Sequence, residues 1–315
     1  MSMTRETRKG GSWLLHETDP SEVFTPERMT DEHRLIAHTT DEFIDTEVLP
    51  NLDRLETKDW ELARRLIRRC GELGLLGTHV PEQYGGLDLD KVSSLIVADR
   101  IARSASFATT YGAQVNLCVL SILLFGTDAQ KQQYLPTLVA GELVGAYALS
   151  EAGSGSDAFA AKTRASRAPD GSWTLTGEKM WISLGNVADN FLVFAWTDLD
   201  KKRARDTSGM SAFIVERASK GFSSGTLEHK WGILAGNTGF FKMDEVEVPS
   251  ENLIGREGEG FKIAMFALDQ GRYTVAAGAT GLVRACRDAS VQYAKTRKTF
   301  GVEIGEHQLV KEMIA

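Results

Sequence analysis

Two short runs of this chain hold residue types that can build a small-molecule site. The first, Tyr147-Ala-Leu-Ser-Glu-Ala-Gly-Ser-Gly-Ser-Asp157, is an apolar strand-like segment that leads into a loop of small residues. The second, Gly177-Glu-Lys-Met-Trp-Ile-Ser183, places an indole and a hydroxyl two positions apart. Residues two apart in a strand face the same side, so Trp181 and Ser183 can contact one flat ligand together. Free N–H groups in the loop suit anionic groups, and this combination is what a flavin site needs.

The loop Ser150–Asp157 supports two interpretations. A run of glycine and serine is also typical of a flexible linker. The apolar strand in front of it and its place between a helical and a β-type region, where clefts form, favour a ligand-binding loop. The residues alone leave both interpretations open.

Two glycine-containing motifs suggest other chemistry but do not fit it. Gly255-Arg-Glu-Gly-Glu-Gly260 lacks the GxGxxG spacing and would place two glutamates against a pyrophosphate. Gly221-Phe-Ser-Ser-Gly225 matches GxSxG formally, but Thr-Leu-Glu-His-Lys follows it where a nucleophile elbow needs a helix. We therefore reject a dinucleotide fingerprint and a serine hydrolase.

Charged residues on the last long helical segment also have two readings each. Asp269 and Arg272 stand three apart, as a surface ion pair or as a charge pair at the mouth of a pocket. Arg297-Lys298-Thr299 ends that segment, either as cations at a helix C-terminus or as a phosphate clamp.

The composition narrows the class of partner. With 36 basic and 43 acidic residues the net charge is −7, which argues against nucleic acid, whose phosphates need a basic surface. Cys70, Cys118 and Cys286 are odd in number and far apart, so we expect reduced, buried thiols. No CxxC occurs and the six histidines have no ligand spacing, so we expect no metal site.

Neither a secretory signal nor a membrane span is expected. Charged residues interrupt positions 1–19, which a signal peptide would fill with an apolar run. The most apolar stretch, Val115–Phe125, is shorter than the roughly 20 residues of a spanning helix, so we expect a buried helix and no transmembrane segment.

The elements that must position these residues follow from periodicity. Helical spacing predicts helices at 30–50, 60–73, 91–103, 111–125 and 129–139, and again at 261–296. Short β-type runs at 173–176, 191–195, 212–215 and 239–244 predict an antiparallel β-domain. We expect an α+β chain with an all-helical domain at 1–144, a β-domain with the ligand loops at 145–256 and an incomplete C-terminal helical bundle at 257–315. The helix near Glu306 has no stop signal before Ala315, so we expect a truncated polypeptide.

Six runs, in order along nearly the whole chain, resemble acyl-CoA dehydrogenases, most closely the very-long-chain branch. The runs are Pro81-Glu-Gln-Tyr-Gly-Gly86, Ala148–Asp157, Gly177–Ser183, Val248-Pro-Ser-Glu-Asn252, Gly271-Arg272, and Arg297-Lys-Thr-Phe-Gly301 with His307-Gln308. The resemblance implies FAD and oxidation of a long-chain acyl-CoA to the trans-2-enoyl-CoA in fatty-acid β-oxidation. It also implies electron-transfer flavoprotein as the acceptor, and a homodimer or homotetramer.

The resemblance also assigns roles to residues. The implied flavin contacts are Tyr147, Leu149, Ser150, Gly155, Ser156, Trp181, Ile182 and Ser183, and, largely across a subunit interface, Arg297, Thr299, His307 and Gln308. The implied substrate contacts are Ser156, Asp269 and Arg272. Leu184 stands where the family usually has Asn, and Ala152 where Pro is common; we expect both to be tolerated.

The catalytic base is the main departure from the family pattern. Removing a weakly acidic proton next to a thioester needs a carboxylate of raised pKa in a dry cleft. Most members carry a Glu in their last helices, which would lie beyond residue 315, and a minority carry it just before the arginine equivalent to Arg272, where this chain has Gly271. We therefore expect no catalytic residue here, and a 315-residue form that is inactive and binds FAD weakly.

Two alternatives remain from sequence. The missing base motivates a non-catalytic flavoprotein-like scaffold or assembly partner, which the gene sequence beyond codon 315 would distinguish. An acyl-CoA oxidase would consume oxygen without another acceptor. The expected location is the bacterial cytoplasm, with membrane association through a part outside these residues as an option. Chain-length preference depends on helix packing around residues 95–125 and 261–280.

Overall fold

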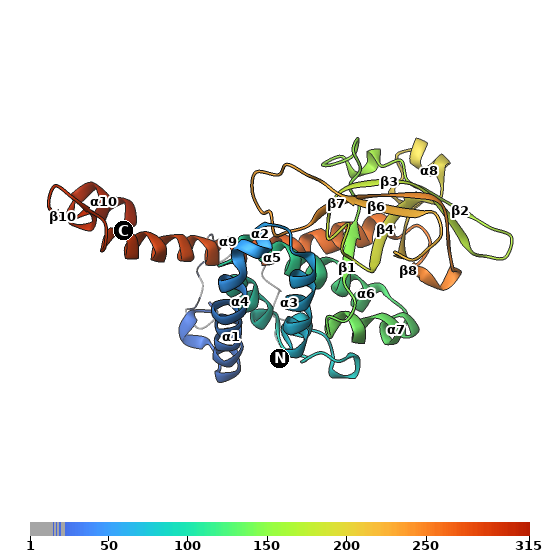
Figure 1. Ribbon diagram of the computed structural model, residues 1–315. Helices are drawn as coiled ribbons and strands as arrows, with labels where there is room; N and C mark the ends of the chain where they lie inside the picture. The colour runs from blue at the N-terminus through green and yellow to red at the C-terminus, as the bar shows by residue number, and fades with distance from the viewer. Residues whose placement is uncertain (1–14, 16, 18, 20–22) are drawn as a thin grey trace, which may run out of the picture.

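The structure is a computed structural model that describes residues 15, 17, 19 and 23–315. The sequence-based prediction about a secretory signal concerns residues 1–19, most of which lie outside the described residues. The helices before the sheet are α1 (Asp31–Phe43), α2 (Leu52–Glu56), α3 (Trp60–Glu72), α4 (Lys91–Ile101), α5 (Ala105–Gly112), α6 (Leu120–Phe125) and α7 (Asp128–Val139). They gather on one side of the β-domain (Figure 1).

The helices begin where side chains cap their free N–H groups. Thr30 and His33 form a reciprocal capping box at α1, and Asp59 caps α3. Gly74, with φ of 74°, ends the chain's second long helix in the left-handed conformation that favours glycine. Helical periodicity therefore placed most of these helices correctly.

One predicted boundary was wrong. The helix expected from Tyr111 begins six residues earlier, at Ala105, because the Ser104 hydroxyl accepts a hydrogen bond from Phe107 N and caps it. Through a wider segment at Ala113–Val119 it continues into α6. Of the described helices, Ala105–Phe125 alone is long and apolar enough to span a membrane, but 61% of its most apolar window is buried in the protein. It is a core helix, as predicted for Val115–Phe125.

The β-domain is one eight-stranded sheet. Its strands are β1 (Gly145–Ala148), β2 (Arg164–Arg167), β3 (Trp173–Ser183), β4 (Asn190–Trp196), β5 (Met210–Glu216), β6 (Phe222–Thr226), β7 (Thr238–Val248) and β8 (Leu253–Ile254), with α8 (Leu199–Arg203) after β4. The order is β6-β7-β3-β2-β4-β5-β8, and β1 pairs with β4. Most pairings are antiparallel, as predicted, but β1 and β2 run parallel to β4.

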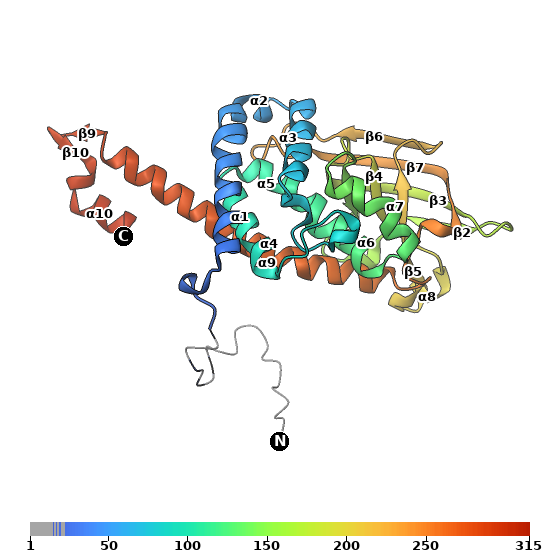
Figure 2. The ribbon, with the colours of Figure 1, turned by 90° about the horizontal axis from the view of Figure 1, so that it is seen from below.

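A long helix leaves the β-domain and carries the C-terminal segment away from it. This helix, α9 (Gly260–Ala294), crosses the helical domain beside α4. It is followed by β9 (Lys298–Thr299), β10 (Val302–Glu303) and α10 (Gln308–Ile314). Figures 1 and 2 both show this end projecting beyond the other helices, at the opposite end of the molecule from the sheet.

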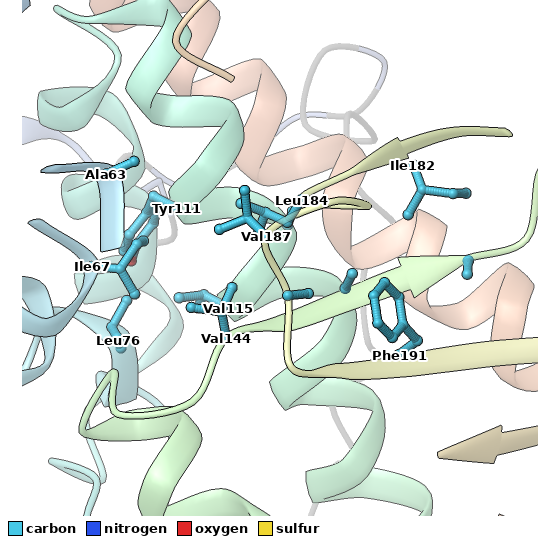
Figure 3. Close-up of a cluster of buried hydrophobic side chains, with 14 of the residues drawn as sticks. Ala63, Ile67, Leu76, Tyr111, Val115, Val144, Ile182, Leu184, Val187 and Phe191 are labelled. Atoms are coloured by element: carbon cyan, nitrogen blue, oxygen red, sulfur yellow. The ribbon is translucent and has the colours of Figure 1, made fainter. Parts of the chain in front are cut away.

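The helical domain and the β-domain share one hydrophobic core. Side chains such as Ile67 and Tyr111 from the helices meet Val144, Leu184 and Phe191 from the β-domain (Figure 3). Burial of this apolar surface is the main stabilising term at the junction.

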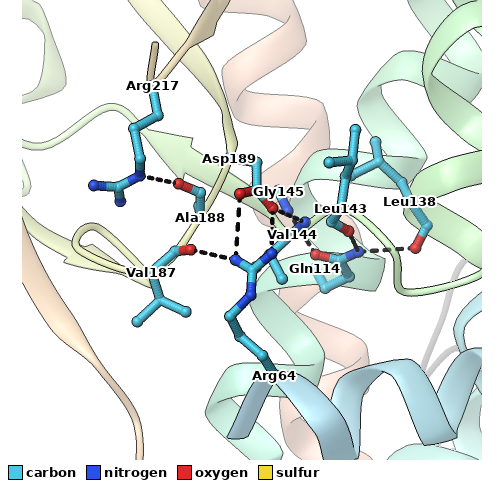
Figure 4. Close-up of polar contacts among 10 residues, drawn as sticks. All are labelled: Arg64, Gln114, Leu138, Leu143, Val144, Gly145, Val187, Ala188, Asp189 and Arg217. Carbon is cyan, nitrogen blue, oxygen red and sulfur yellow. Dashed lines mark hydrogen bonds and ion pairs between the residues drawn. The ribbon is translucent and has the colours of Figure 1, made fainter. Parts of the chain in front are cut away.

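Polar contacts fix the same junction (Figure 4). The Arg64 guanidinium donates to Val187 O at 2.7 Å and to Asp189 Oδ2 at 2.9 Å. The same Asp189 oxygen accepts from Val144 N at 2.8 Å. The buried Gln114 amide accepts from Gly145 N, so the first residues of β1 are held by side chains of the helical domain.

The cysteines do not all follow the prediction. Cys70 and Cys118 are buried thiols, as expected, and burial raises the pKa of Cys118 to about 12. Cys286 is exposed on α9, which corrects the expectation of three buried thiols. Its helix face has no covering element among the described residues.

Candidate active site

The loop after β1 presents backbone N–H groups that no protein atom uses. Glu151 and Ser154 exchange two backbone hydrogen bonds, of 2.9 and 3.1 Å, and the Ser154 hydroxyl donates to Asp157 O. In the described part of the chain, the N–H groups of Gly153, Gly155 and Ser156 have no hydrogen-bond acceptor. Such a cluster of free donors suits phosphate or another anionic group.

The end of β3 displays the two side chains singled out in the sequence. A β-bulge at Trp181, with φ of 63°, shifts the register against β7. The indole is 61% exposed, Ile182 is buried, and Ser183 is half-buried. Trp181 and Ser183 therefore lie on the open side of the strand, as predicted, with Ile182 on the core side between them.

Loop and strand meet directly. Met180 N donates to Ser150 O at 3.0 Å, and the buried Lys179 ammonium donates to Leu149 O and to Glu151 Oε1, both at 3.0 Å. Sequence reasoning gave Lys179 and Glu151 no role. The available signal was a lysine at an inward-facing strand position, where a charge is rarely tolerated without a partner.

The Glu151 carboxylate has four donors. Besides Lys179 it accepts from Lys162 N at 2.6 Å, Thr163 N at 3.0 Å and the Thr163 hydroxyl at 2.6 Å. Burial by itself raises the pKa of the Glu151 carboxyl, but the Lys179 ammonium and these hydrogen bonds together hold that pKa below its ordinary value. Glu151 is therefore an ionised carboxylate that is engaged by hydrogen bonds, and it does not serve as a general base.

An apolar cavity of about 400 Å³ begins at Ser183 and extends along α9. Its wall from α9 comprises Gly271, Thr274, Val275, Gly278, Ala279 and Leu282. The opposite walls comprise Ala98, Ile101 and Ala102, and the segment from Ala105 to Leu117 with Ala105, Ala108, Thr109, Tyr111, Gly112, Ala113, Asn116 and Leu117. Among the described residues, no aspartate or glutamate lines it. The cavity, which we call the apolar cavity, suits a long hydrocarbon group.

Several predicted contact residues face the core, so only their backbone can serve a ligand. The Tyr147 ring packs on Phe194, and its hydroxyl donates to Ala264 O at 3.1 Å. Leu149 and Ile182 are buried apolar side chains. Ser150, Gly155 and Ser156 lie on the loop with the free N–H groups.

Asp269 and Arg272 form an exposed ion pair on α9, two positions before and one position after the cavity-lining Gly271. Asp269 does not line the apolar cavity, whereas Gly271 does.

The remaining predicted contacts lie elsewhere. Arg297, Thr299, His307 and Gln308 belong to the projecting C-terminal segment, where the Thr299 hydroxyl and His307 Nε2 are 3.0 Å apart. Figures 1 and 2 place this segment far from β3 within one chain. The structure thus joins the loop, β3 and α9 in one site and leaves these four residues outside it.

Comparison with known proteins gives the class to which this fold and site belong. The models "Acyl-CoA dehydrogenase, N-terminal domain", "middle domain" and "C-terminal domain" match residues 30–142, 146–246 and 258–315 in that order. The chain belongs to the acyl-CoA dehydrogenase family.

Individual relatives agree. The chain is 44% identical over 310 residues to a probable acyl-CoA dehydrogenase of Bacillus subtilis, covering 98% of this chain and 51% of that protein. It is 38% identical to a second acyl-CoA dehydrogenase of Bacillus subtilis, covering 91% of this chain and 74% of the relative. The crystal structure of an acyl-CoA dehydrogenase complexed with FAD from Bacillus anthracis matches with a TM-score of 0.92 and 43% identity, over 98% of this chain and 52% of that one. The chain thus spans about half the length of two of these proteins.

Proposed function

We propose that this chain holds the flavin- and substrate-binding part of an FAD-dependent acyl-CoA dehydrogenase. The observation that carries the proposal is the apolar cavity, because it is lined by Ser183, two residues after the exposed Trp181, and so joins a place for a flat cofactor at the end of β3 to a place for a hydrocarbon chain. The residues fit FAD: free N–H groups on Gly153, Gly155 and Ser156 suit its phosphates. When bound, FAD supplies the hydride-accepting chemistry, and the protein supplies orientation.

The chain's own residues would act as follows. The Ser183 hydroxyl, which has no partner among the described residues, would hydrogen-bond the flavin ring edge, and Trp181 would cover one ring face. Asp269 and Arg272, exposed beside Gly271, would contact the CoA arm together with Ser156. The apolar walls would exclude water from the reacting carbons.

We further propose a long-chain acyl-CoA as substrate, as expected for the very-long-chain branch and for fatty-acid β-oxidation. The cavity follows α9 from Gly271 to Leu282, and eleven helical steps of 1.5 Å span about 16 Å. That length accommodates an extended chain of roughly a dozen carbon–carbon bonds. Half of the eighteen lining residues are alanine or glycine, so much of the wall is free of bulky side chains.

The proton-abstracting carboxylate is proposed to come from outside these 315 residues. The support is the lining of the apolar cavity, in which the position next to the reacting end is Gly271 and no acidic side chain takes part. The 315-residue form is accordingly proposed to be inactive and to hold FAD weakly.

A homo-oligomer is proposed because four implied flavin contacts lie at the far end of α9. In one chain, Arg297, Thr299, His307 and Gln308 are remote from β3, so they would reach a flavin bound by another subunit. Exposed Phe300, Leu309 and Met313 in the same segment would be covered in such an assembly. We propose electron-transfer flavoprotein as the acceptor and the bacterial cytoplasm as the location.

Anaerobic titration tests the function. The 315-residue polypeptide, mixed with FAD, should bind palmitoyl-CoA more tightly than butyryl-CoA without bleaching the flavin absorbance. Bleaching would show that the base lies within these residues, and a lack of any FAD or acyl-CoA binding would refute the proposal. For any longer form that turns over, two measurements separate the dehydrogenase from the oxidase. Reduction of electron-transfer flavoprotein indicates a dehydrogenase, and oxygen uptake without another acceptor indicates an oxidase.

A further inference from the structure

A buried ion pair joins strand β3 to the loop after β1, the two segments that carry the proposed cofactor site within this chain. Of the ion pairs in the described part of the chain, Lys179–Glu151 is the most deeply buried, with side-chain exposures of 0% and 9%. Burying two charges is unfavourable unless their geometry and hydrogen bonds are complete. The pair therefore calls for an explanation beyond stability, since an apolar pair of similar size would be no less stable there.

The contacts of the pair supply that explanation. Lys179 holds Leu149 O at the start of the loop, and the Glu151 carboxylate holds Lys162 N and Thr163 N at its end. Both ends of the loop are thus attached to one carboxylate–ammonium pair. The Glu151–Ser154 backbone hydrogen bonds close the loop between these attachment points and leave the N–H groups of Gly153, Gly155 and Ser156 without an acceptor among the described residues.

The pair also fixes the strand that carries the indole. Lys179 is two residues before Trp181, whose backbone is in the left-handed region that side chains other than glycine rarely adopt. Such a conformation persists only when its surroundings hold it. Here Met180, the residue between Lys179 and Trp181, donates its N–H to Ser150 O. This hydrogen bond holds the loop and the bulge together.

The neighbouring glycine is part of the same arrangement. Gly177 has φ of 155°, and a Cβ there would lie 2.5 Å from Thr163 Oγ1 and 2.7 Å from Thr163 Cα. Only glycine lets Thr163 approach closely enough to give both its N–H and its hydroxyl to Glu151. The Gly-Glu-Lys sequence before Trp181 therefore serves the loop closure.

We propose that Glu151 and Lys179 are a positioning pair that preforms the cofactor site: they hold the loop and the Trp181 bulge in register before any ligand binds. The inference rests on the proposed function for the identity of the ligand, FAD. Neither residue touches the ligand in this scheme; both act through the Ser150–Ser156 backbone and Trp181.

The test uses the full 315-residue chain and three variants: Glu151→Gln, Lys179→Met and the double variant. Each single variant leaves a buried charge or dipole without its partner, so it should lower the melting temperature. The double variant leaves no unpaired charge, so its melting temperature should recover toward that of the unmodified chain. Asp99→Asn with Arg284→Met is the matched control, because it removes another two-contact pair, at 2.8 Å, between α4 and α9.

Two readouts are specific to positioning. The first is FAD affinity, measured by flavin fluorescence, and the second is hydrogen exchange of the amides at 150–163 in the FAD-free chain. The double variant should stay on the order of tenfold weaker for FAD despite its recovered stability, a size typical of losing groups that orient ligand-binding atoms. Its loop amides should exchange faster than those of the control double variant.

Recovery of FAD affinity and loop protection together with the melting temperature would overturn the proposal and leave the pair a purely structural one. If the double variant does not fold, Glu151→Gln decides, since unchanged FAD affinity and loop exchange in that variant would equally overturn it. If the unmodified chain binds no FAD, the proposed function fails, while the hydrogen-exchange comparison still decides whether the pair preforms the loop.

Discussion

The two halves of α9 differ in what they pack against. Residues 260–274 bury Gly260, Ile263, Ala264, Ala267 and Thr274 against the sheet and the helical domain. Residues 275–294 bury only Gly281 and Ala294, although Val275, Val283 and Tyr293 are apolar or aromatic and largely exposed. A single helix thus combines an anchored half with an exposed arm, although the arm carries four of the six α9 residues that line the apolar cavity. The difference shows that burial along one helix changes from a tightly packed half to a half with exposed apolar side chains.

The largest effect is expected from Ile263→Ala in the anchored half. Ile263 is fully buried, so removing its side chain should lower the free energy of unfolding by about 2–5 kcal/mol through lost burial and a residual cavity. Val283→Ala in the exposed arm should change it by less than about 0.5 kcal/mol. Urea denaturation of both variants measures the contrast. Equal losses of unfolding free energy in the two variants would show that the exposed arm is packed as tightly as the anchored half.

A second prediction concerns the crossing of α9 and α4. A Cβ at Gly281 would lie 1.8 Å from Asp99 O, whereas one at Gly278 would make ordinary contacts of 3.5 Å. Gly281→Ala should therefore destabilise the protein by about 1–3 kcal/mol through overpacking. Gly278→Ala should be neutral or slightly stabilising, since alanine favours a helix over glycine. Thermal unfolding of the two variants tests this close approach of α9 to α4. Equal melting temperatures for both variants would contradict the prediction.

The third prediction concerns Gly278, which lies in the exposed arm and lines the apolar cavity. Gly278→Leu should fill its far part and weaken palmitoyl-CoA binding by about tenfold, within the range expected for hydrophobic pockets. Octanoyl-CoA binding should change little, because a shorter chain does not reach this position. Calorimetric titration of both ligands measures the ratio, with Gly278→Ala as the control. A parallel loss of both affinities would mean that the chain does not extend along α9.

The smallest effect is expected at the start of the anchored half. Hydrogen bonds from the Arg256 side chain and backbone lower the pKa of Glu259 from 4.5 to about 2. A carboxyl whose folded pKa is lowered stabilises fully above its unfolded pKa, and this contribution is lost as the pH falls from about 4.5 toward 2. Glu259→Gln should lower the melting temperature at pH 6 by about 1 °C. Scanning calorimetry at pH 6 and pH 3 should show the difference shrinking at the lower pH, and a constant difference would contradict this role.

Local patterns predicted most of the helices and the β-domain, whereas the predicted contacts with flavin and substrate stay predictions. The accessible positions of Trp181 and Ser183 depend on the β-bulge at Trp181, since strict alternation would put them on the side of the buried Lys179. Helical periodicity placed α1, α3 and α9. It failed at α5, where the capping signal of Ser104 was overlooked, and at β1 and β2, whose parallel pairing with β4 depends on chain crossings that local patterns do not encode.

The part of the site that sequence reasoning missed is its long-range support. Lys179 and Glu151 are 28 residues apart, and their contact depends on the return of β3 beside the loop. The positive φ of Trp181 is likewise a property of the β-bulge, which arises from pairing with β7. A charged residue inside an otherwise apolar alternation was the one local sign of that support.

The Arg64–Asp189 contact has a consequence for biosynthesis. The two residues are 125 positions apart, so at 5–20 residues per second the ribosome adds Asp189 roughly 6–25 s after Arg64. In the later part of that interval, after α7 has been added, the helical domain is complete, but the partner of its guanidinium and the strands that cover Ile67 and Tyr111 have not yet followed. The nascent helical domain therefore displays an apolar face with a cationic group beside it, which is a surface that chaperones of the ribosome exit would encounter before the sheet closes over it.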